Sequence, residues 1–144
     1  MAEAPALGTP TTPVQETRAP RRRSEDQLSD GERRQATVLF SDLSGFVSLN
    51  ERLDPEEVGA LLGSIKAQAI QIVERHGGIV NQVVGDEILA LFGTPTTHED
   101  DPIRAVRAAI ALHEMVRQFS LHVEDRISQK LRLHTGINSG LIVT

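Results

Sequence analysis

Residues 79–92 read IVNQVVGDEILALF, two apolar, strand-like runs separated only by Gly85-Asp86. A two-residue link containing glycine between such runs is typical of a β-hairpin, because glycine adopts the positive φ angle that the turn requires. We therefore expect strands over residues 79–84 and 87–92. The hairpin gives a fixed point from which the flanking segments can be placed.

A helix is predicted on the N-terminal side of this hairpin. Asp54-Pro55 can start it, because aspartate caps the free N–H groups of a first helical turn and proline suits the first helical position. Apolar residues recur at helical spacing over residues 58–73, and Gly77 ends the segment. Further upstream, residues 35–41 read QATVLFS and predict a buried strand that ends at Asp42.

A second helix and a last strand are predicted on the C-terminal side. Asp100-Asp101-Pro102 opens the helix, residues 131–134 begin the strand, and residues 136–144 are expected to form a turn that enters another strand. The order strand, helix, strand, strand, helix, strand is typical of the ferredoxin-like βαββαβ fold. The sequence therefore predicts an α+β class, with helices packed on an antiparallel sheet.

The first part of the chain has a different composition. Four of the seven prolines lie in the first twenty residues, apolar residues are few, and Arg21, Arg22 and Arg23 follow. Such a segment buries too little apolar surface to offset the entropy lost on ordering. Residues 1–32 are predicted to be a disordered Pro/Arg-rich tail, and residues 33–144 to be the folded domain.

Composition excludes several function classes. The chain carries 15 basic and 20 acidic residues and a net charge of −5, which disfavours nucleic-acid binding. It has no Cys, so disulfides, thiol catalysis and Cys-ligated metals are excluded. No apolar run approaches the ~18 residues of a membrane span, and no secretory signal is visible. We expect a cytoplasmic protein without a membrane span.

Two aspartates lie at unusual positions for chemistry. Asp42 ends a predicted buried strand, and Asp86 lies in the hairpin turn. In a ferredoxin-like sheet the first strand and this hairpin are neighbours, so both carboxylates can converge at one edge of the sheet. Two such carboxylates repel each other and attract hard divalent cations such as Mg²⁺. Asp at a strand end and Gly-Asp in a turn are also common as simple caps and turn formers, and this alternative stays open.

Four segments carry a resemblance to a known family. Residues 40–46, FSDLSGF, resemble the Phe-x-Asp-x-x-Gly-Phe motif of class III nucleotide cyclases, the adenylate/guanylate cyclase catalytic domain. Residues 84–93, VGDEILALFG, resemble the second motif of that family. The segment that begins His98-Glu99-Asp100-Asp101-Pro102 and residues 133–140, LHTGINSG, resemble later parts of the same domain.

The resemblance implies a site and a reaction. In that family the two motif aspartates bind two Mg²⁺ or Mn²⁺ ions, which assigns this role to Asp42 and Asp86, with the carbonyl of Leu43 as a further ligand. The backbone of residues 44–46 (Ser44, Gly45 and Phe46) is implied to contact the triphosphate, beside Gly85. The reaction implied is attack of the ribose 3′-oxygen on the α-phosphate of ATP, or less favourably GTP. It releases pyrophosphate and a 3′,5′-cyclic nucleotide for intracellular signalling, the activity of a phosphorus–oxygen lyase.

Two departures from the family pattern matter. Gln82 stands where the family has an adenine-selecting Lys, four residues before the second aspartate. A glutamine amide both donates and accepts, so it lacks the donor-only preference of Lys. The sequence also stops at Thr144, before the second base-reading residue and the Asn-x-x-x-Arg pair that binds ribose and stabilises the transition state.

These departures lead to expectations about assembly. Cyclase sites of this family lie between head-to-tail subunits, so the partner is expected to be a second copy in a homodimer or a complete cyclase domain in a heterodimer. Residues 33–144 form a C-terminally incomplete domain, and the chain alone is expected to be inactive. Two alternatives are a non-catalytic, cyclase-like dimerisation or regulatory module, and a diguanylate-cyclase-like enzyme, because Gly85-Asp86-Glu87 resembles the Gly-Gly-Asp-Glu-Phe turn of those enzymes.

Overall fold

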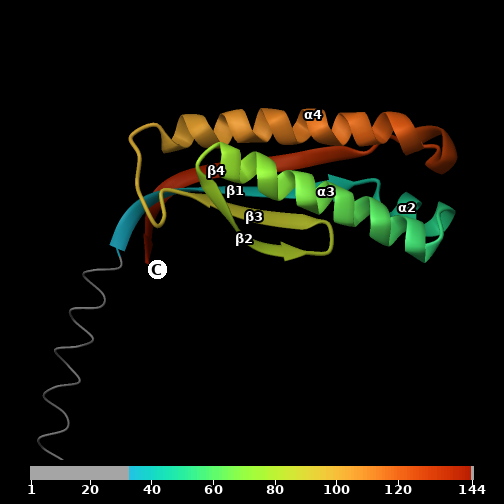
Figure 1. Cartoon of the computed structure of the whole chain (residues 1–144), viewed down its shortest axis with the longest axis horizontal. Helices are drawn as coiled ribbons and strands as arrows, with labels where there is room; N and C mark the ends of the chain where they lie inside the picture. The colour runs from blue at the N-terminus through green and yellow to red at the C-terminus, as the bar shows by residue number, and fades with distance from the viewer. Residues whose placement is uncertain (1–32, 144) are drawn as a thin grey trace, which may run out of the picture. The chain divides into compact units, whose positions relative to one another are not determined.

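A computed structural model describes residues 33–143; the predicted tail 1–32 and Thr144 lie outside the described residues. Residues 34–141 form one compact unit. The elements in chain order are β1 (Arg33–Ser44), α2 (Phe46–Arg52), α3 (Pro55–Arg75), β2 (Gly78–Val84), β3 (Glu87–Phe92), α4 (Asp101–Ile127) and β4 (Arg132–Val143) (Figure 1). The predicted βαββαβ order is confirmed, with α2 as a short additional helix.

The four strands form one sheet in the order β2-β3-β1-β4. The hairpin partners β2 and β3 run antiparallel, and β3 is antiparallel to β1, with Thr37 opposite Phe92 and Asp42 opposite Glu87. Side-chain hydroxyl contacts pair Thr37 with Ser139 and, four residues further along β1, pair the next such position with a residue four earlier in β4. β4 therefore also runs antiparallel to β1, and the predicted antiparallel ferredoxin-like sheet is confirmed.

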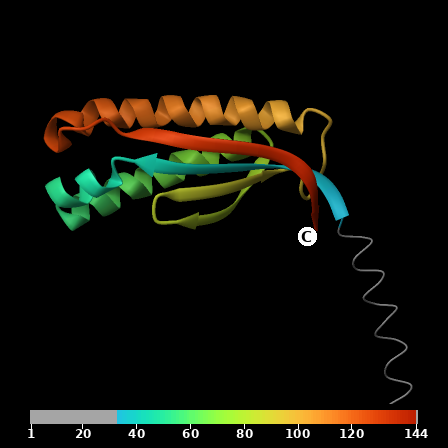
Figure 2. The same ribbon diagram turned by 180° about the vertical axis from the view of Figure 1, so that it is seen from behind.

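Helices α3 and α4 lie on the same face of the sheet (Figures 1 and 2). Alternate residues of β1 and β3 point into the core beneath them, including Leu39, Ala90 and Phe92, which are fully buried. Gly78 is required at the start of β2, because a Cβ there would lie 2.6 Å from the ring of Phe92. The opposite face carries no helix of the described residues, so side chains on it remain available.

Both long helices begin as the sequence predicts. The backbone N–H of Asp54 donates to the Glu57 side chain (3.4 Å) at the start of α3. At the start of α4, the backbone N–H of His98 donates to the Asp101 carboxylate (2.8 Å), and Arg104 donates to Asp100 (2.8 Å). These contacts satisfy the acidic residues before α4 as helix-start caps.

Two boundary predictions were wrong. β1 continues past Asp42 to Ser44, because it keeps pairing with β3 up to the hairpin turn. Residues 136–144 were expected to contain a turn, yet Arg132–Val143 is one continuous strand. Gly136 and Gly140 do not adopt a positive φ, so they continue the strand. Among residues 33–143, no helix is long and apolar enough to cross a membrane.

Candidate active site

The strand register brings the two predicted metal aspartates to one end of the sheet. The Cα of Asp42 lies opposite that of Glu87, the residue that directly follows Asp86 in the hairpin turn. Gly85 holds this turn with a φ of 58°, the left-handed value that favours glycine. Asp42 and Asp86, which are 44 positions apart in the chain, therefore lie at neighbouring strand ends.

Alternation along β1 decides which way Asp42 faces. Its neighbours Ser41 and Leu43 are buried, at 0% and 5% exposure, on the helix-covered face. Side chains alternate between the two faces of a strand, so Asp42 projects from the open face. Asp42 and Asp86 are both half-buried, whereas Glu87 is exposed. The carboxylates are thus accessible to a ligand from solvent.

No cation of the protein neutralises this pair. Among the described residues, no Lys, Arg or His forms an ion pair with Asp42 or Asp86. Residues 33–143 also contain no cluster of three or more His, Asp or Glu side chains that could enclose a metal by themselves. Two carboxylates in an otherwise open site fit Mg²⁺, which keeps several waters and takes one or two protein carboxylates together with substrate phosphates.

The residues after Asp42 turn the chain sharply. Leu43 packs its side chain into the core, and the hydroxyl of Ser44 donates to the carbonyl of Arg132 (3.3 Å). Gly45 has a φ of 92°, and a Cβ on it would lie 3.0 Å from the Leu131 side chain. Phe46 is the first residue of α2. Glycine at position 45 therefore permits both the turn and the close approach of the segment before β4.

Gln82 lies on the same open face as Asp42. A β-bulge between Val80 and Gln82 shifts the register, so that Gln82 is opposite Leu89, which in turn is opposite Phe40 of β1. Gln82, Leu89 and Phe40 line a depression of about 90 Å³, together with Val84, Glu87 and Ile88. An exposed amide above apolar side chains is a suitable surface for a flat heterocycle.

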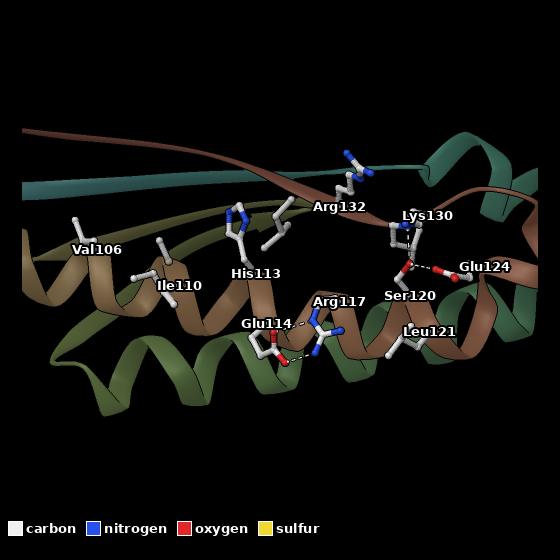
Figure 3. Close-up of a pocket in the computed structure, with 13 residues that line it drawn as sticks. Val106, Ile110, His113, Glu114, Arg117, Ser120, Leu121, Glu124, Lys130 and Arg132 are labelled. Carbon is white, nitrogen blue, oxygen red and sulfur yellow. Dashed lines mark hydrogen bonds and ion pairs between the residues drawn. The ribbon is translucent and has the colours of Figure 1, made fainter.

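Sequence reasoning missed the apolar part of this depression. Phe40 is 45% exposed, which is unusual for a large aromatic side chain in a central strand. The signal was its place in the alternation, two positions before Asp42 on the same face. A larger groove of about 860 Å³ lies between α4 and residues 130–133, and none of the predicted site residues lines it (Figure 3).

Comparisons with known proteins agree with this geometry. Residues 29–144 match the family described as the adenylate and guanylate cyclase catalytic domain. The receptor-type guanylate cyclase gcy-23 of Caenorhabditis elegans is 30% identical over 107 residues, which is 74% of this chain and 10% of that protein.

Two solved structures show the same fold. The guanylyl cyclase Cya2 is 38% identical with a TM-score of 0.69, and the alignment covers 78% of this chain and 57% of that one. The adenylyl cyclase CyaB from P. aeruginosa is 31% identical with a TM-score of 0.70, covering 76% and 58%. The chain thus spans little more than half the length of these solved domains. The family match extends over most of the sequence and the fold agrees, so this protein belongs to the adenylate and guanylate cyclase catalytic domain family.

Proposed function

We propose that this nucleotide cyclase domain binds a purine nucleoside triphosphate through divalent metal ions held by Asp42 and Asp86. The observation that carries the proposal is the register that sets Asp42 opposite Glu87, next to Asp86, with no cation of the described residues to neutralise them. Like charges brought together without a partner favour binding of a cation. The family match makes a triphosphate–metal complex the expected ligand.

Each site residue has a role in the proposal. The carboxylates of Asp42 and Asp86 and the carbonyl of Leu43 hold two Mg²⁺ or Mn²⁺ ions, which supply charge neutralisation at the phosphates when bound. Backbone N–H groups of residues 44–46 contact the triphosphate, and Gln82 contacts the base. In the reaction the ribose 3′-oxygen bonds to the α-phosphorus, the bond to the β-phosphate oxygen breaks, and pyrophosphate leaves. The contribution of the protein is positioning and electrostatic stabilisation.

The partner subunit supplies the remaining groups in this proposal. No Asn in the 144 residues is followed by Arg four positions later, so the chain carries no copy of the family's ribose and transition-state pair. A complete cyclase domain that contributes this pair across a shared interface would form one working site with Asp42 and Asp86. Two copies of this chain would form none, so we expect the homodimer to be inactive.

Binding and activity test this assignment separately. Mn²⁺-dependent binding of a fluorescent ATP analogue should weaken at least about tenfold in Asp42→Asn and in Asp86→Asn, because each removes a charged metal ligand. Asp125→Asn, an exposed aspartate of α4, is the matched control and should bind as the parent does. Equal metal-dependent binding by all variants would refute the metal site.

A mixed dimer tests catalysis. The chain is combined with a full-length cyclase whose own metal aspartates are replaced, and cyclic nucleotide is measured. We expect activity from the mixture and its loss when the chain carries Asp42→Asn. Demonstrated dimers without activity would favour the second candidate, a non-catalytic regulatory module. Gln82 in place of Lys, together with the missing Asn–Arg pair, favours this alternative.

A further inference from the structure

A chain of three polar side chains crosses the molecule directly behind Asp42. The Ser41 hydroxyl shares a hydrogen bond with the Thr135 hydroxyl (2.8 Å), and Thr135 shares another with Nε2 of His113 (2.8 Å). The three residues come from β1, β4 and α4. Figure 3 shows His113 projecting from α4 toward the sheet. Thr135 is therefore the one group that links the strand of Asp42 to both an edge strand and the helix layer.

Burial makes this link effective. Ser41 is 0% exposed, and buried hydroxyls lose more from an unmade hydrogen bond than exposed ones do. Ser41 is bonded to Asp42 by one peptide unit and projects from the opposite face of β1. Fixing the Ser41 side chain on the helix side consequently fixes the backbone that aims the Asp42 carboxylate from the open side.

The metal geometry makes such support consequential. Mg²⁺ requires near-octahedral coordination at short distances, so small displacements of a carboxylate weaken binding. Groups that orient metal ligands from behind typically change metal affinity by ~10–100-fold when they are removed. We propose that Thr135 is a positioning residue for Asp42, acting through Ser41 and supported by His113. The inference rests on the proposed metal site and adds to it a residue from the segment 133–140 to which no role is otherwise assigned.

The sheet offers a matched control for this proposal. Thr37 and Ser139 form the same kind of hydroxyl contact between β1 and β4 (2.7 Å), five residues away from Asp42. Thr37 is 1% exposed, so its hydroxyl is also buried. Thr→Val removes a hydroxyl with little change of shape at either position. The two variants therefore remove equivalent interstrand bonds, only one of which adjoins Asp42.

The experiment compares Thr135→Val with Thr37→Val for Mn²⁺-dependent binding of the fluorescent ATP analogue. Thr135→Val should weaken metal-dependent binding about tenfold, whereas Thr37→Val should stay within about twofold of the parent. Thr135→Ser restores the hydroxyl and should restore the affinity. Equal effects of the two Thr→Val variants, or failure of Thr135→Ser to rescue, would overturn the proposal.

Amide hydrogen exchange keeps the test independent of the proposed function. Exchange in residues 41–44 should be faster in Thr135→Val than in Thr37→Val, with or without metal. If the parent binds no metal–nucleotide complex, the proposed function has failed. Thr135 is then no positioning residue for a metal ligand, even where exchange shows that it orders β1. If the parent binds and exchange in residues 41–44 is unchanged by Thr135→Val, the positioning role alone has failed.

Discussion

The two faces of β1 place different demands on neighbouring residues. On the helix-covered face, Leu39 and Ser41 have no exposed surface, and each apolar or polar group there has packing or hydrogen-bond partners. On the open face, Phe40 is 45% exposed and Asp42 is half-buried. One strand thus separates the groups that stabilise the fold from those available to a ligand. Substitutions on the two faces should affect different properties of the protein.

The largest effect should come from adjacent residues on opposite faces. Leu39→Ala creates a cavity in a fully buried position and should lower the free energy of unfolding by about 2–5 kcal/mol. Phe40→Ala removes a side chain that is already half in water and should cost about 1 kcal/mol. Urea denaturation measures both. Comparable losses for the two variants would mean that the faces do not differ in this way.

A glycine under the helix layer gives the next effect. Gly78→Ala would set a Cβ 2.6 Å from the Phe92 ring, and overpacking of this kind costs about 1–3 kcal/mol. Gly63→Ala is the control, because a Cβ at this exposed position in α3 meets nothing within 4 Å. The control should stabilise the helix by about 0.5–1 kcal/mol. Thermal unfolding of both variants should therefore shift in opposite directions.

On the open face, Gln82→Lys should change base preference and leave stability nearly unaltered. Lys presents only donors to the purine, so binding should shift toward ATP relative to GTP, measured by competition of each nucleotide with the fluorescent analogue. Stability should stay within about 0.5 kcal/mol of the parent, as for other surface substitutions. Gln71→Lys on the exposed side of α3 controls for the added charge. An unchanged ATP-to-GTP ratio would show that Gln82 does not face the base.

The smallest effect concerns the solvent side of α4, outside both faces of the sheet. Hydrogen bonds from Arg117 and then Gln118 lower the pKa of Glu114 from 4.5 to about 2. A carboxyl whose pKa is lowered on folding stabilises the protein above its unfolded pKa, and the contribution disappears as the pH falls through the folded pKa. Between about pH 4.5 and 2, Glu114→Gln should therefore flatten the decline of the unfolding free energy slightly, and above pH 5 the slope should be unchanged. Chemical denaturation at several pH values tests this.

Local patterns in the sequence predicted most of the fold because they depend on near neighbours in the chain. Gly85-Asp86 between two apolar runs predicts the hairpin, and Asp54-Pro55 predicts the start of α3. The short helix α2 was not predicted, because seven residues carry too little periodic signal. The continuity of β4 through Gly136 and Gly140 depends on pairing with β1, and local glycine preferences favoured a turn there.

The sequence alone determined which residues could do chemistry: the two aspartates, the glycine turn after the first, and Gln82 in place of a lysine. The tertiary structure decided how they meet. Strict alternation along β2 would place Gln82 on the same face as Val80, against the helices, but the bulge between them moves Gln82 to the open face with Asp42. Likewise, only the pairing of β1 with β3 sets Asp42 beside the hairpin turn. Register and bulges arise from contacts between strands distant in sequence, so no local pattern in one strand can fix them.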